Sequence, residues 1–141
     1  MQSINNIYIE ATTDTIYPYL LDVDNRSAYI PQLKRVDLID PLPFKEGSKY
    51  IEVATIAGQE LKTTYQITVL VPGRIISART VKSIFPIQVD LLLEPQDTGT
   101  NITIQLEFTL RGIFKLASGI VKGIVDEQSR GILTRLKREL E

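Results

Sequence analysis

Residues 101–140 read NITIQLEFTLRGIFKLASGIVKGIVDEQSRGILTRLKREL, and the hydrophobic pattern changes within this stretch. Up to Arg111, apolar and polar residues alternate one for one, which is the period of a β-strand with one buried face. From Ile113 onwards, apolar residues recur every three or four positions, as in an amphipathic α-helix. The pattern therefore predicts a last strand followed by one long helix, with Lys137 and Arg138 complementing the dipole of its final turn.

The period of two extends back from this stretch to Leu33, and turn residues divide it into runs. Residues 41–47, 57–59 and 94–99 read as loops, and Pro72-Gly73 suits a type II turn. We expect strands at 34–39, 48–56, 60–70, 75–82, 87–93 and 100–111. Because no helical pattern separates them, these strands should form an antiparallel meander.

The first thirty residues predict one more strand and two short helices. Isoleucines alternate with polar residues up to Ile9, and the Thr-Thr-Asp run at 12–14 offers side chains that cap a helix. Pro18 lies inside the helical segment, so we expect a late start or a kink there. A second short helix should cover residues 26–29. The predicted fold class is α+β, a single domain over 1–141 whose curved antiparallel sheet of about seven strands wraps around a long C-terminal helix.

The amino-acid composition limits the partners and the catalytic groups that the protein can use. The chain has 141 residues, of which 43% are hydrophobic and 23% charged, as in a soluble globular protein. Sixteen basic against seventeen acidic residues give a net charge of −1, so no overall basic field favours nucleic acid or an anionic membrane. Cys and His are absent, which removes disulfides, thiolate or imidazole catalysis and the metal sites built from them. We expect no metal, no cofactor and no defined catalytic set.

The N-terminal sequence lacks the basic and apolar regions of a secretory signal, and no apolar run approaches the ~20 residues that span a bilayer. We therefore expect a cytoplasmic protein that does not insert into membranes.

Three stretches carry a resemblance to a known family: IYIEATTDTIYPYLLDVDNRSAYIP (7–31), VLVPGRIISART (69–80) and LLLEPQDTGTNITIQLEF (91–108). With the order of elements, they make the chain similar to the SRPBCC superfamily, which includes START-type lipid-transfer domains, birch-pollen-allergen-like proteins and the polyketide cyclase/dehydrase group. The resemblance covers essentially the whole chain. It implies a helix-grip fold that encloses an apolar cavity for lipids, sterols, polyketides or other hydrophobic ligands, and no shared catalytic signature.

Alternation along the strands assigns the residues that face the interior. For each apolar position we favour core packing over ligand contact, because protein interiors are normally filled. The buried hydroxyls are more telling, because each needs a partner that a ligand oxygen, a trapped water or the backbone could supply. The inward-facing candidates for ligand contact are Thr63, Tyr65, Val89, Leu91, Leu106 and Phe108.

The long helix and one loop complete the candidate ligand-binding site. Ile120 and Ile124 belong to the apolar stripe, and Gln128 lies near its middle, where an amide needs a hydrogen-bond partner. We expect Gln128 and Tyr65 to be the polar anchors of the cavity. In the segment 83–86, Phe85 is placed to form a rim at the cavity mouth, although packing under the helix or a dimer contact explains it about as well.

Three glycines interrupt the long helix, namely Gly119, Gly123 and Gly131, and each costs about 1 kcal/mol relative to Ala. Close approach of the helix to the sheet is one explanation, and we favour it slightly. The other is a helix that bends to admit ligand.

Charged residues in the middle of the strands favour cross-strand ion pairs on the outer face over an acid/base pair. This prediction concerns Glu52, Asp90, Glu107, Arg79 and Lys62, and the facing of Arg79 is ambiguous because Ile75 and Ile76 are both apolar.

The first functional hypothesis is binding or transport of a hydrophobic small molecule or lipid, without catalysis, by a monomer or homodimer. The second is an enzyme resembling the polyketide cyclase/dehydrase group, in which Tyr65, aided by Gln128 or Thr63, handles protons. The third is a protein-interaction module that uses the loop around Phe85.

Overall fold

The structure is a computed structural model that describes residues 1–56, 58–83 and 85–141. Its strands are β1 (Gln2–Ile9), β2 (Leu33–Leu38), β3 (Lys49–Ile56), β4 (Gln59–Val71), β5 (Ile75–Thr80), β6 (Ile87–Gln96) and β7 (Gly99–Phe108). Its helical elements are α1 (Thr13–Leu21), the 3-10 turn η1 (Val23–Asn25), α2 (Arg26–Tyr29), the 3-10 helix η2 (Gly112–Ala117) and α3 (Ser118–Leu140).

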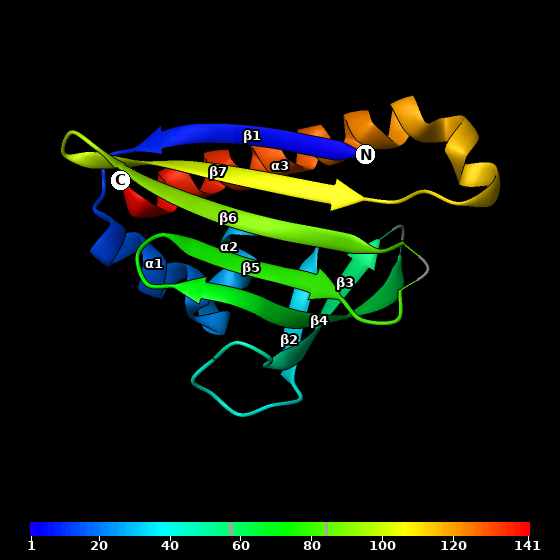
Figure 1. Cartoon of the computed structure of the whole chain (residues 1–141), viewed down its shortest axis with the longest axis horizontal. Coiled ribbons are helices and arrows are strands. Elements are labelled where there is room, and N and C mark those ends of the chain that lie inside the picture. The colour runs from blue at the N-terminus through cyan, green and yellow to red at the C-terminus, as the bar shows by residue number, and fades with distance from the viewer. Residues whose placement is uncertain (57, 84) are drawn as a thin grey trace.

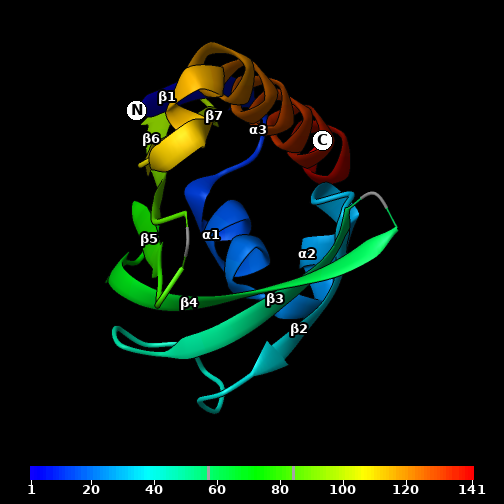
Figure 2. The same ribbon diagram turned by 90° about the vertical axis from the view of Figure 1, so that its right-hand side faces the viewer.

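The seven strands form one antiparallel sheet in the order β1-β7-β6-β5-β4-β3-β2 (Figure 1). The sheet curves strongly, so that β2, β3 and β4 face α3 across the interior, while α1 and α2 lie inside the curve (Figure 2). Helix α3 packs along β1 and against α2. The predicted helix-grip fold of the α+β class is therefore confirmed, and its strands fall within a few residues of the expected bounds.

Two details of the helices differ from expectation. Helix α1 runs from Thr13 through Pro18 without a late start, because Pro18 is exposed and the carbonyl freed by its missing N–H can face water. The long helix does not begin at Ile113. Gly112, with a φ of +61°, turns the chain into the 3-10 helix, and α3 starts only at Ser118 without a side-chain cap.

The tightly packed core lies at the end of the molecule where α1 meets the C-terminal half of α3 (Figure 1). Here β1 and β7 meet in register, with Ile9 opposite Thr100 and Ile7 opposite Ile102. The fully buried large side chains of this end, which we call the closed end, are Ile9, Ile16, Leu20, Ile102, Leu133 and Leu136. The opposite end carries η2, the start of α3, the β3–β4 turn and the β5–β6 loop, and we call it the open end.

Among the described residues, no helix combines the length and apolarity that crossing a membrane requires.

Candidate functional site

The strand register places six of the predicted ligand-binding residues on the concave face of the sheet. Val89 on β6 lies opposite Leu106 on β7, and Tyr65 on β4 lies opposite Thr80 on β5. Phe108 is fully buried, whereas the other five keep part of their surface accessible. Those five half-buried residues are Thr63, Tyr65, Val89, Leu91 and Leu106. The middle of the concave face thus keeps some accessible surface, which we call the groove, although none of these five residues lines either of the two hollows described in this section.

The helix side of the predicted site is more exposed than a closed cavity would require. Ile120 is 71% exposed and Ile124 is 50% exposed. Gln128 is also exposed, so its amide can bond water and needs no protein partner. With Ile124 it lines a hollow of about 340 Å³ beside Pro31, and Tyr65 does not line this hollow. The structure therefore does not bring the two expected polar anchors together.

A polar cluster that sequence reasoning missed lies beside Tyr65. The Arg26 guanidinium, carried by α2 and almost fully buried, donates a hydrogen bond of 2.7 Å from Nη1 to Oε2 of Glu52 on β3. Its Cζ atom lies 4.7 Å from the centroid of the Tyr50 ring, which is cation–π distance. The Tyr50 and Tyr65 rings stack with centroids 5.7 Å apart. Four side chains thus form one contiguous group at the β3–β4 side of the groove.

Electrostatics keep the tyrosines of this cluster protonated. Burial raises the pKa of Tyr65 above its ordinary value, and the negative charge of Glu52 adds to the rise. Burial raises the pKa of Tyr50 in the same way, although the positive charge of Arg26 opposes it. Burial by itself lowers the pKa of the Arg26 guanidinium. The electrostatic interactions with Tyr50 and Glu52 raise this pKa by more than burial lowers it, so the net shift is upward. At neutral pH the site therefore presents phenol O–H donors beside the Arg26–Glu52 ion pair.

The prediction that Glu52 lies on the outer face is wrong. Glu52 is opposite Thr63 in the β3–β4 register and shares its concave face. Alternation could not identify this, because both faces of β3 carry apolar residues. Asp90 and Arg79 do face outward, but in the described chain Asp90 accepts a hydrogen bond from Ser77 and Arg79 donates to Gln66, so the expected ion pairs are not formed.

The expected close approach of α3 to the sheet at its glycines is also wrong. A Cβ atom added at Gly119, Gly123 or Gly131 would meet no atom within 4 Å. By contrast, a Cβ at Gly99 would overlap the carbonyl oxygen of Ile9 and the Tyr8 side chain. Packing therefore explains the glycine that begins β7 and not those of the helix.

The β5–β6 loop reaches the start of the helical region. The Phe85 ring meets the Phe114 ring of η2 edge to face, with centroids 4.9 Å apart. Ile84, which sequence reasoning placed in the same loop, lies outside the described residues. The contact puts Phe85 beside η2 at the open end, and a rim at a cavity mouth stays a prediction for this residue.

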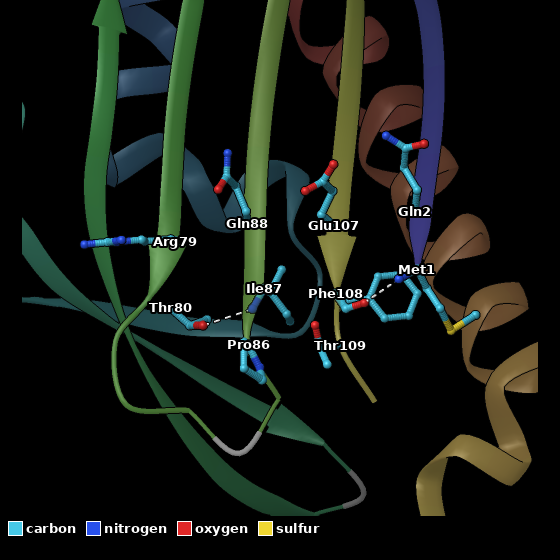
Figure 3. A pocket seen from close by; sticks show the side chains of 10 residues that line it. All are labelled: Met1, Gln2, Arg79, Thr80, Pro86, Ile87, Gln88, Glu107, Phe108 and Thr109. Atoms are coloured by element: carbon cyan, nitrogen blue, oxygen red, sulfur yellow. Dashed lines mark hydrogen bonds between the residues drawn. The ribbon is translucent and has the colours of Figure 1, made fainter. Parts of the chain in front are cut away.

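A larger hollow, of about 510 Å³, lies at the ends of β1, β5, β6 and β7 (Figure 3). Its wall includes a row of outward-facing polar residues from the four strands, and of the predicted site residues it contains Phe108. That row is Gln2, Glu107, Gln88 and Arg79. Its lining combines these outward-facing side chains with Thr80, Ile87 and Phe108 of the concave face, so the hollow lies at the strand ends, and Phe108 is the residue that it shares with the concave-face set named above.

Comparison with known proteins agrees with this architecture. The Zhui aromatase/cyclase from Streptomyces sp. R1128 superposes with a TM-score of 0.82 at 17% identity, over 99% of this chain and 93% of that chain. The di-domain aromatase/cyclase StfQ of the steffimycin biosynthetic pathway gives 0.81 at 16% identity, over 99% of this chain and 50% of its own. Ara h 8.0201 gives 0.75 at 12% identity, over 99% and 97%. At these identities the likeness shows the helix-grip fold.

The family follows from the sequence itself. The model of the family described as polyketide cyclase / dehydrase and lipid transport matches residues 5–141, and the chain belongs to this family. No curated protein matches the chain.

Proposed function

We propose that the protein binds a hydrophobic small molecule bearing a polar oxygen, with its apolar body in the groove and its oxygen at Tyr65. The observation that carries this proposal is the half-exposed apolar surface of β6 and β7 beside the Arg26–Glu52 cluster. A ligand with an apolar body and a polar oxygen would contact both the apolar surface and the polar cluster.

The apolar part of the groove supplies the affinity. Val89, Leu91 and Leu106 retain surface that an apolar ligand would remove from water, at roughly 25 cal/mol per Å². Phe108 and Ile104, which are buried beside them, give this surface a rigid base. Such a site selects by shape and apolarity, which suits lipids and polyketides alike.

The polar part supplies orientation. Among the described residues, no neighbour forms a hydrogen bond with the Tyr65 hydroxyl. This hydroxyl is not fully buried, because the one fully buried side-chain oxygen without a partner in the described residues belongs to Thr68. A tyrosine phenol is protonated at neutral pH, and burial raises the pKa of Tyr65 further, so Tyr65 is a donor suited to a carbonyl, hydroxyl or ether oxygen. Arg26 is already neutralised by Glu52, so the site has no unpaired cation that demands an anionic ligand.

A second function, cyclisation or dehydration of a reactive chain, is supported by the family description and by the aromatase/cyclase neighbours. In this case the protonated Tyr65 would stabilise a carbonyl oxygen as charge develops on it. Replacing Tyr65 by Phe distinguishes the two functions. A cyclase would lose turnover of a polyketide substrate while retaining its binding, whereas a carrier would lose only part of its affinity.

The first experiment is native mass spectrometry of freshly purified protein, together with analysis of its organic extract. We expect a discrete adduct whose chemical class the extract identifies. The extracted molecule is then titrated into Leu106→Trp, which fills the groove, and into Gln105→Trp, which adds the same side chain to the adjacent outward-facing position. Loss of binding in the first variant alone supports the groove. Equal affinity in both variants would remove the groove from the proposal.

A further inference from the structure

The open end carries an unusual concentration of exposed apolar side chains. Leu116 is 90% exposed and Ile113 is 77% exposed, and both belong to η2. They are followed on α3 by Ile120 and Ile124, which are also largely exposed. Together with Phe85 and Phe114 these residues form what we call the mouth rim. Monomeric soluble proteins seldom expose so large a cluster without a partner for it.

The segments that carry the mouth rim also contain charge of only one sign. Segments 80–86 and 108–125 contain four cations and no acidic residue, although the whole chain has a net charge of −1. Lys122 is engaged by Asp126, with Nζ and Oδ2 2.9 Å apart. The other three, Lys82, Arg111 and Lys115, are exposed and form no ion pair within the described ranges.

These two segments are distant in sequence but adjacent in space. The Phe85–Phe114 contact joins the β5–β6 loop to η2. In Figure 1, η2 and the start of α3 extend beyond the ends of β6 and β7. In Figure 2, the start of α3 stands at the edge of the curved sheet. The exposed apolar and cationic groups are therefore presented together at one end of the molecule.

We propose that the mouth rim docks onto the surface of an anionic lipid bilayer. Exposed apolar side chains flanked by cations are the pattern of an interfacial segment, in which the apolar groups enter the headgroup boundary and the cations meet anionic lipids. This contact is peripheral and needs no spanning helix. It places the open end of the groove at the lipid surface, but it does not depend on the identity or presence of a groove ligand.

A second copy of the chain fits this surface less well. A two-fold contact sets a patch against itself, and here it would bring Lys82, Arg111 and Lys115 of both copies together without an acidic partner in the rim segments. Anionic lipid supplies the missing negative charge. Self-association is nevertheless a clear alternative outcome, and the experiment is designed to detect it.

The test is sedimentation of the full chain with vesicles of phosphatidylcholine alone or of equimolar phosphatidylcholine and phosphatidylserine. We expect binding to the anionic vesicles, weakened by added salt, and little binding to the neutral ones. Leu116→Asn should lower partitioning about tenfold through lost apolar burial. Arg111→Gln with Lys115→Gln should lower it about twenty-fivefold, since each cation near an anionic surface contributes about fivefold.

Matched controls change the same chemistry elsewhere. Ile39→Asn replaces an apolar residue that is also exposed, and Lys45→Gln with Arg138→Gln removes two exposed cations away from the rim. These variants should bind vesicles like the wild type. Their circular dichroism, and that of the rim variants, should be unchanged because all the substituted side chains are exposed.

Three results would overturn the proposal: no binding to anionic vesicles at low salt, equal losses in rim and control variants, or concentration-dependent dimerisation that Leu116→Asn abolishes. Ligand binding in solution is measured on the same variants. If Leu116→Asn loses vesicle binding but retains ligand, the rim and the groove act separately, so each proposal can fail without the other.

Discussion

The two ends of the molecule use similar residues in opposite ways. At the closed end, Leu133 and Leu136 of α3 are buried against β1 and α1. At the open end, Ile120 and Ile124 of the same helix continue the apolar stripe but remain largely in solvent. The N-terminal half of α3 therefore exposes its apolar stripe to solvent, whereas the C-terminal half buries it in the core. The difference indicates that stability is concentrated at one end, which leaves the other free for binding.

The largest effect should come from truncating the closed end. Leu136→Ala removes a fully buried side chain and should lower the free energy of unfolding by about 3–4 kcal/mol. Leu116→Ala, at the open end, should change it by less than about 0.5 kcal/mol. Urea denaturation of both variants measures the contrast. Similar losses at the two positions would show that the ends do not differ in this way.

Between the ends, the Arg26–Glu52 pair should be the next most sensitive feature. Glu52→Gln leaves a buried guanidinium without its counter-charge and should cost about 3 kcal/mol. Glu60→Gln breaks the exposed contact with Lys34 and should have no measurable effect. Thermal and urea unfolding of the two variants would compare them. If both were neutral, the pair would not hold α2 against β3.

Alkaline pH should weaken the core around Tyr29, which belongs to the closed-end cluster. Burial raises the pKa of Tyr29 to about 12, from an ordinary value of 10.0. The folded state then holds a proton that the unfolded state releases, so its stabilising effect is full below pH ~10 and declines up to pH ~12, by roughly 2 kcal/mol. Tyr29→Phe should flatten this decline in unfolding experiments between these pH values. An unchanged slope would assign the decline to other groups.

The smallest effects should come from adding one methyl group at glycines of the two ends. Gly99→Ala forces a Cβ into the Ile9 carbonyl and should destabilise the protein by about 1–2 kcal/mol. Gly123→Ala meets open space on α3 and should stabilise it by about 1 kcal/mol. Differential scanning calorimetry should therefore give shifts in Tm of opposite sign. Shifts of the same sign would contradict the assigned environments.

The fold could be predicted because it depends on periodicity, and the strands before Arg111 and the helix after it have different periods. The partial exposure of the candidate site could not be predicted from the sequence. Periodicity shows which side chains share a face, but Leu136 and Ile120 lie on the same apolar stripe while only Leu136 is buried. Glu52 was assigned to the wrong face for a related reason. Because β3 carries apolar residues on both faces, alternation does not show which of its faces points inward. The concave-face position of Tyr65 could be predicted from alternation, whereas its role in binding stays a prediction.

The sheet order also has a consequence for how the chain reaches this fold. Every described pair of neighbouring strands is consecutive in sequence except β1 and β7, which join Gln2 to Glu107. During synthesis β1 leaves the ribosome before the other six described strands, whereas its partner β7 is the last of the seven to emerge. The meander from β2 to β7 can form from local contacts while β1 waits, because closing so long a loop is slow. We therefore expect β1 and α3 to dock last, which makes the unpaired β1 the segment of the nascent chain that most needs a chaperone.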